Sequence, residues 1–178
     1  ADTALTFAQT LLGLGLVILL ITLDNKMPFV IAFIGMVTLV AYEGRLKATG
    51  ISGNIAVGFM SGAVFLYAGM AVANPGPTLW LFGLAFLATI SREIIKDIQD
   101  LEGDKDRFTL PARIGIDASL NIAIGILIIA ILLSYTAINL FENMALNAYL
   151  ASISLANGVM VYGLYNAKHE DYFMGQKN

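Results

Sequence analysis

The chain has 178 residues, of which 58% are hydrophobic and 13% charged, and its formal net charge is −3. Soluble domains carry roughly 25% charged residues, so this composition excludes an ordinary soluble domain and indicates an integral membrane protein. Because the chain has no cysteine and a single histidine, disulfides, thiolate chemistry and histidine-rich metal centres are also excluded.

Six segments approach the roughly 20 apolar residues that a helix needs to cross a bilayer. We therefore predict an all-α, multi-span transmembrane bundle without a separate soluble domain. The segments are residues 5–23, 28–42, 53–73, 78–95, 118–140 and 144–166. On one side of the membrane they are joined by predicted turns at residues 24–26, 74–77 and 142–143. Proline and glycine within 74–77 predict a compact turn that no helix passes through.

The basic residues sort to one side of this predicted topology. Only Lys26 falls on the other side. The nine on the shared side are Arg45, Lys47, Arg92, Lys96, Lys105, Arg107, Arg113, Lys168 and Lys177. By the positive-inside rule, the loops that carry them are expected to face the cytoplasm.

The charge is densest in one stretch, residues 91–107, which holds 10 of the 23 charged residues. Four acidic residues there share one face if the stretch is read as a helix: Glu93, Asp97, Asp100 and Asp104. Arg92 and Lys96 flank that face. Like charges at this spacing repel one another unless a cation lies among them, and oxygen ligands of this kind suit Mg²⁺ together with substrate phosphates. Gly103 disfavours a helix interior, so Asp97 and Asp100 form the firmer part of the predicted site.

Three other interpretations apply to a charged stretch of this kind. A solvated surface loop gives no reason to align the acids on one face. A calcium loop of the EF-hand type that begins at Asp100 would need glycine where Lys105 stands and glutamate where Pro111 stands. The sequence is also compatible with a third interpretation, in which the stretch is the charged gate of a transporter.

A second basic feature, residues 42–47, lies on the same predicted side of the membrane. Arg45 and Lys47 serve either as charges that set topology or as phosphate ligands near the acidic stretch.

Residues 92–104 read Arg-Glu-Ile-Ile-Lys-Asp-Ile-Gln-Asp-Leu-Glu-Gly-Asp, and Thr-Leu-Pro and a glycine follow at 109–111 and 115. This stretch resembles the second aspartate-rich motif of the UbiA superfamily of intramembrane prenyltransferases, closest to its archaeal ether-lipid branch. Residues 42–47, with Gly53 and Asn54 after them, are similar to the family's tyrosine–lysine segment, although the interval from Tyr42 to Lys47 is one residue longer than usual. The resemblance covers most of the chain.

The resemblance implies nine helices and two aspartate-rich motifs around a central cavity, with six of the helices and the second motif present here. Residues 1–178 would then form a single transmembrane domain, the C-terminal part of a UbiA-type domain shortened at both ends. On this expectation the first motif and the ninth helix lie outside the chain.

The resemblance also implies Mg²⁺-dependent transfer of a prenyl group, expected to be geranylgeranyl, from its diphosphate to a lipid acceptor, expected to be geranylgeranylglyceryl phosphate. Asp97, Asp100 and Asp104 would be the catalytic residues that hold Mg²⁺ on the diphosphate. The substrate-binding residues would be Lys47, Arg92, Lys96, Tyr42 and Asn54.

Two other functions stay open on the sequence: a prenyltransferase of quinone or chlorophyll synthesis, and a cation transporter or channel subunit. Transporters tend to place ionisable groups near the bilayer midplane, whereas the predicted spans are almost free of charge, which favours an enzyme. We expect membrane lipid around the protein and no nucleic-acid partner. The sequence leaves the oligomeric state open.

Overall fold

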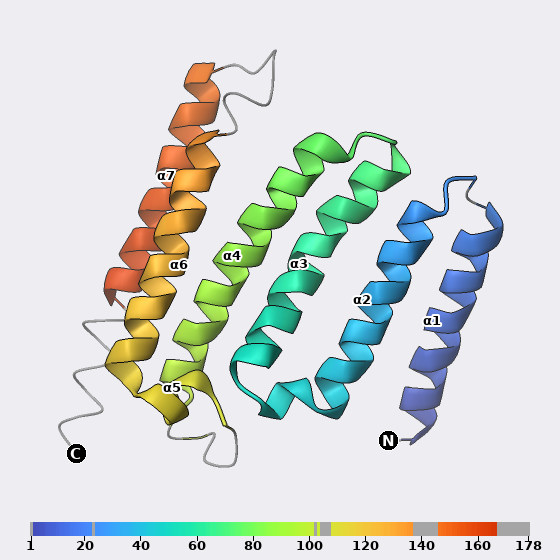
Figure 1. The fold of residues 1–178 in the computed structure, drawn as a ribbon, viewed down its shortest axis with the longest axis horizontal. Coiled ribbons are helices and arrows are strands. Elements are labelled where there is room, and N and C mark those ends of the chain that lie inside the picture. Colours follow the sequence, from blue (N-terminus) through green and yellow to red (C-terminus); the bar gives the residue numbers. More distant parts are fainter. Residues whose placement is uncertain (1, 23, 102, 104–107, 137–145, 167–178) are drawn as a thin grey trace. The chain divides into compact units, whose positions relative to one another are not determined.

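The computed structural model describes residues 2–22, 24–101, 103, 108–136 and 146–166. Within these residues it has seven α-helices and one short 3₁₀-helix, η1 (Figure 1). The elements are α1 (Asp2–Thr22), α2 (Met27–Gly44), η1 (Leu46–Ala48), α3 (Ile51–Ala71), α4 (Pro75–Gln99), α5 (Leu110–Ile114), α6 (Ile116–Thr136) and α7 (Leu146–Asn166).

Five of these helices, α2, α3, α4, α6 and α7, are long and apolar enough to cross a membrane. The remaining predicted span, residues 5–23, corresponds to α1, where the apolar stretch Thr6–Thr22 is shorter. An apolar run in lipid forms a helix because only a helix or a closed barrel pairs every backbone N–H and C=O internally. The prediction of an all-α, multi-span membrane protein is confirmed.

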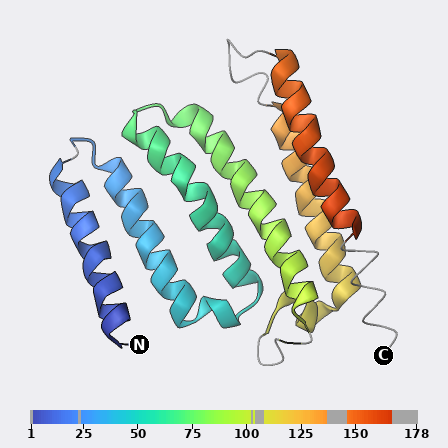
Figure 2. The same ribbon diagram turned by 180° about the vertical axis from the view of Figure 1, so that it is seen from behind.

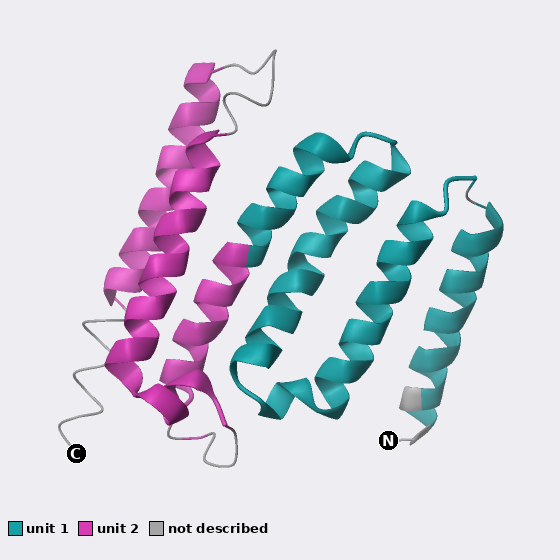
Figure 3. Ribbon diagram, in the orientation of Figure 1, with its two compact units in different colours: residues 1–86 teal, residues 87–178 magenta. Residues whose placement is uncertain are grey.

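The chain divides into two compact units, Ala1–Phe86 and Leu87–Asn178 (Figure 3). The first contains α1, α2, η1, α3 and the beginning of α4, and its four long helical segments lie side by side in both views (Figures 1 and 2). The second contains the end of α4, with α5, α6 and α7. The charged end of α4 therefore belongs to the second unit.

One predicted turn is wrong. Residues 74–77 were expected to lie outside any helix, but α4 begins at Pro75. A proline is tolerated in the first turn of a helix because its missing N–H would have no intrahelical partner there. The reversal instead lies at residues 72–74, where Ala73 has a φ of 55° and Asn74 N donates to Gly69 O at 2.9 Å. The predicted turn at 142–143 falls outside the described residues.

Small residues allow α3 to approach the beginning of α4 closely. A Cβ placed on Gly62 would lie 2.6 Å from Phe82 Cδ2, and one on Gly69 would lie 1.8 Å from Thr78 Oγ1. Neither distance leaves room for a methyl group. Helices in lipid associate through such contacts because burial of apolar surface does not drive them together there.

In the second unit, polar side chains join α6 to α7. Tyr149 OH donates to Ser134 O at 2.6 Å, and Asn157 Nδ2 donates to Ser134 Oγ at 3.1 Å. The hydroxyl groups of Tyr135 and Ser154 lie 3.3 Å apart. Hydrogen bonds between helices in lipid contribute roughly 0.6–2 kcal/mol each, so this cluster ties the two helices together.

Candidate functional site

The charged end of α4 carries the predicted metal ligands. Asp97 lies within the helix and is 3% exposed, on the same buried face as Ile90, Ser91 and Ile94. Ser91 Oγ donates to Ala123 O at 2.9 Å, which attaches this face to α6. Asp97 is thus held at a defined position within the second unit.

The predicted acidic face is shorter than expected. The helix ends at Gln99, so Asp100 lies in the turn that follows and is exposed. Its backbone N–H still donates to Lys96 O at 2.9 Å, and its carbonyl accepts from Gly103 N at 3.0 Å. A helix ends readily at such a turn before glycine. Asp104, the third predicted ligand, lies outside the described residues.

Glu93 pairs with both basic residues of the stretch. Arg92 Nη2 lies 2.8 Å from Glu93 Oε1, and Lys96 Nζ contacts Glu93 Oε2. The Glu93 side chain is 5% exposed, whereas those of Arg92 and Lys96 are 75% and 48% exposed. We call these three residues the basic triad; with one carboxylate and two cations it carries a net charge of +1.

The carboxylates of Asp97 and Asp100 suit a Mg²⁺ ion that has further ligands from outside the protein. In the described part of the chain, no group of three or more acidic or histidine side chains could enclose a metal ion. Asp97 and Asp100 offer two carboxylates near each other in the sequence. Mg²⁺ is usually bound by one or two carboxylates plus substrate phosphates rather than by a cage made only of protein. The residues present therefore suit an ion that a substrate phosphate helps to hold.

Thr109, directly before α5, adds a polar group beyond the acidic stretch. It is 2% exposed, and its hydroxyl has no hydrogen-bond partner among the residues that the structure describes. Buried hydroxyl groups are generally hydrogen-bonded, so this one is a candidate to bind water or a ligand. Nothing in the described residues places it beside Asp97.

The other predicted substrate-binding residues lie in the first unit, where α2 passes through η1 into α3. Gly50 makes the bend with a φ of 65°. A Cβ on Gly53 would lie 2.7 Å from Leu46 O and 3.7 Å from the Tyr42 ring, so Tyr42 lies close to the first turn of α3. Asn54, next in that turn, is 6% exposed.

Lys47 lies in η1 and is exposed. Its Nζ is 3.8 Å from Glu43 Oε2, a loose ion pair in which both side chains are more than half exposed. The structure thus brings Tyr42, Lys47 and Asn54 to one connection of the first unit. It places Asp97, Asp100, Arg92 and Lys96 at the end of α4, in the second unit.

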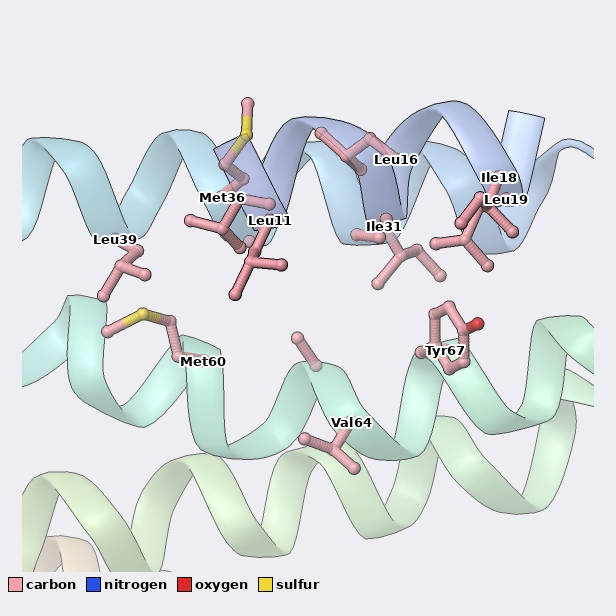
Figure 4. Close-up of a pocket in the computed structure, with 15 residues that line it drawn as sticks. Leu11, Leu16, Ile18, Leu19, Ile31, Met36, Leu39, Met60, Val64 and Tyr67 are labelled. Atoms are coloured by element: carbon pink, nitrogen blue, oxygen red, sulfur yellow. The ribbon is translucent and has the colours of Figure 1, made fainter. Parts of the chain in front are cut away.

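An apolar groove of about 750 Å³ runs between α1, α2 and α3 in the first unit. Figure 4 shows side chains of α1 and α2 facing α3 across it, with Met60 toward one end and Tyr67 toward the other. Ligand pockets typically measure roughly 300–1,000 Å³. The groove therefore has the size and the apolar character that a long hydrocarbon chain needs.

The apolar helices are those of an integral membrane protein. Most of its described acidic and basic site residues gather at the end of one spanning helix, α4. Residues 1–175 match the family described as the UbiA prenyltransferase family. The chain belongs to this family, which confirms the resemblance of its motifs.

Two curated relatives that the chain resembles bear the same name. A digeranylgeranylglyceryl phosphate synthase from Methanothrix thermoacetophila is 39% identical over 137 residues, which cover 76% of this chain and 49% of the relative. One from Methanococcus aeolicus is 40% identical over 134 residues, covering 74% and 47%. The chain thus spans about half the length of these relatives.

A solved structure agrees with the fold. It is described as giving "structural and mechanistic insights into the biosynthesis of Digeranylgeranylglyceryl phosphate synthase in membranes". The TM-score is 0.78 at 32% identity, over 95% of this chain and 60% of that one.

Glu93 belongs to the predicted acidic face but is not among the predicted site residues. A signal was present, because Glu93 stands beside Arg92 and three residues before Lys96, a spacing that brings side chains together on a helix. The groove gave no such signal, because apolar residues facing lipid and apolar residues lining a groove look alike in a sequence.

Proposed function

We propose that the protein transfers a geranylgeranyl group from its diphosphate to the hydroxyl of geranylgeranylglyceryl phosphate, a step of archaeal ether-lipid synthesis. One observation carries the proposal: buried Asp97 directly follows Lys96 of the basic triad and lies one turn after Glu93, at the end of an apolar, membrane-length helix. Membership of the UbiA prenyltransferase family and the name shared by its relatives support the reaction and the acceptor.

In this reaction the bond between C1 of the prenyl chain and the diphosphate oxygen breaks, and the diphosphate leaves with the electron pair. The acceptor hydroxyl oxygen bonds to C1, and its proton passes to the released diphosphate. When bound, Mg²⁺ would offset the negative charge that develops on the leaving group. Asp97 and Asp100 would hold that ion, and we assign Asp104 as a third ligand.

Cationic side chains would bind the phosphate oxygens. Arg92 presents a largely exposed guanidinium, whose flat fork of donors matches phosphate geometry. Lys96 and Lys47 supply point charges, and Tyr42 and Asn54 supply neutral polar groups. The reactive cation formed at C1 must be kept from water, and the apolar side chains of the spanning helices exclude water.

The groove between α1, α2 and α3 is our candidate for the isoprenoid tail of a substrate. Its lining is aliphatic along most of its length, with Leu11, Leu16, Ile31 and Leu39 among the residues that form it. A prenyl tail has no polar group to satisfy, so such a groove suffices to hold it.

The test is transfer of a radiolabelled geranylgeranyl group from its diphosphate to geranylgeranylglyceryl phosphate by the full-length protein in lipid, with and without Mg²⁺. We expect Asp97→Asn and Asp100→Asn to lower turnover by about two orders of magnitude, the usual cost of removing a charge-stabilising group. Asp24→Asn is the matched control, because Asp24 is exposed in the connection between α1 and α2.

Parallel assays with an aromatic acceptor such as 4-hydroxybenzoate separate the alternatives. Transfer to the aromatic compound but not to the lipid would contradict the proposed acceptor. No transfer to either acceptor would contradict prenyl transfer. If Asp97→Asn and Asp24→Asn had equal activity, the assignment of the metal ligands would be wrong.

A further inference from the structure

Glu93 is a buried carboxylate to which the proposed function assigns no role. Its side chain is 5% exposed, on the face of α4 that also buries Ser91 and Ile94. Acidic residues are rarely buried unless a cation compensates them. Here each carboxylate oxygen has its own cation, Arg92 at Oε1 and Lys96 at Oε2.

The two cations reach Glu93 from the same flank of α4, one helical turn apart, and each contacts a different carboxylate oxygen. Successive helix residues are rotated by about 100°, so Arg92 lies about 100° to one side of Glu93 and Lys96, three residues later, about 60° to the same side. Both side chains are long, and they are 75% exposed for Arg92 and 48% exposed for Lys96. A shared partner reduces the number of rotamers that such long side chains sample.

Pairing with Glu93 does not exhaust the donors of the two cations. A guanidinium has five N–H groups and an ammonium has three, and the bonds to Glu93 engage one nitrogen of each side chain. The exposed part of the Arg92 guanidinium can donate to another anion, and the half-exposed Lys96 ammonium adds a positive charge beside it. The basic triad also keeps a net positive charge, so it still attracts a phosphate.

We propose that Glu93 is a positioning residue: its buried carboxylate holds Arg92 and Lys96 together as a two-point receptor for the phosphate oxygens of the substrate. The proposal rests on the proposed function for the identity of the phosphate compound. Glu93 itself contacts no substrate, and it acts through the geometry of the two cations.

The direction in which Glu93→Gln changes pyrophosphate affinity separates a positioning role from a purely electrostatic effect of Glu93. Glu93→Gln keeps the size of the side chain but removes its charge, so the net charge of the triad rises from +1 to +2. If charge governs anion binding, pyrophosphate will bind more tightly. If positioning governs it, pyrophosphate will bind more weakly in spite of the added positive charge.

The experiment measures pyrophosphate affinity by calorimetry, in the presence of Mg²⁺, on the full-length protein in lipid nanodiscs. We expect Glu93→Gln to weaken binding about 10-fold. Glu43→Gln is the matched control, because Glu43 pairs with Lys47 but is largely exposed. This change removes the same charge and should leave affinity unchanged or raise it.

A second variant covers the case in which Glu93→Gln does not fold, which thermal unfolding will reveal. Glu93→Asp keeps the charge, but its shorter side chain reaches one cation and not both, so we expect a smaller loss of affinity. Wild-type affinity in every folded variant at position 93 would overturn the proposal.

Failure of the proposed function would look different. If the wild-type protein transfers no geranylgeranyl group, yet Glu93→Gln weakens pyrophosphate binding, the proposed function fails while the role of Glu93 stands. If transfer occurs and Glu93→Gln binds pyrophosphate normally with unchanged turnover, the role of Glu93 fails while the proposed function stands.

Discussion

At the scale of single residues, the ion pairs of Glu93 contribute little to the free energy of unfolding. Their main effect is to orient the side chains of Arg92 and Lys96. The Arg92 side chain is 75% exposed, and exposed pairs contribute about 0–1 kcal/mol. A buried carboxylate without a cation costs more, typically about 3–5 kcal/mol when a buried pair is broken. Glu93 thus depends on the cations for its own burial, and it orients them in return.

Gly69 is a residue whose replacement tests the packing of α3 against α4. A methyl group there would lie 1.8 Å from Thr78 Oγ1 and 2.8 Å from Thr78 Cβ. We expect Gly69→Ala to destabilise the protein, because overpacking costs about 1–3 kcal/mol whereas the change from glycine to alanine gains at most about 1 kcal/mol in helix propensity. Thermal unfolding in detergent measures the effect.

The control for this substitution is Gly76→Ala, where the added methyl group meets nothing within 4 Å. Truncating the opposing side chain in Gly69→Ala/Thr78→Ala should restore part of the loss, since the hydroxyl and the methyl group of Thr78 are both removed. Equal unfolding temperatures for the Gly69 and Gly76 variants would contradict the close contact.

At the scale of elements, three neighbouring helices form the groove that we assign to an isoprenoid tail. Gly35 of α2 lines it, and a side chain added there has open space within 4 Å. We expect Gly35→Leu to occupy part of the groove and to shift preference from geranylgeranyl toward the shorter farnesyl diphosphate. The ratio of kcat/KM for the two donors is the measurement.

Gly13→Leu serves as the matched variant. Gly13 lies in α1, also has open space around an added side chain, and does not line the groove. Both substitutions replace glycine in a helix by the same apolar residue, so helix propensity and lipid contact change alike. The same donor ratio in the two variants would show that the groove holds bilayer lipid rather than substrate.

At the scale of the whole molecule, the direction of the spans decides which compartment supplies the substrates. The helix α3 (Ile51–Ala71) has 21 residues, and at about 1.5 Å per residue it matches the roughly 30 Å hydrocarbon core. Ser52 and Asn74 are exposed near its opposite ends. Because the chain has no cysteine, a single introduced cysteine is a unique label.

We expect Ser52→Cys to react with a membrane-impermeant maleimide from the cytoplasmic face and Asn74→Cys to react from the other face. The excess of basic residues on the side of Ser52 predicts this orientation. The same pattern predicts that the loops with Lys47 and Asp100 share a side, since two spans, α3 and α4, separate them. Labelling of both cysteines from one face would contradict the topology.

Hydropathy along the chain sufficed to predict the spans, because lipid forces each apolar run to satisfy its backbone internally, whatever its neighbours are. The order of charges at residues 92–104 likewise sufficed to indicate the family, because the motif is local in sequence. The start of α4 was misjudged, because Pro75 and Pro77 are compatible with both a turn and the first turn of a helix.

Properties that depend on contacts between elements needed the tertiary structure. The sequence places Glu93 and Asp97 on one face of a helix, but their burial follows from the packing of that face, where Ser91 bonds to Ala123 of α6. The same holds for the contact of Gly69 with Thr78 and for the groove between α1, α2 and α3. Whether a side chain meets lipid, another helix or an open groove is decided by which residues distant in sequence come to face it, and the local pattern carries no record of them.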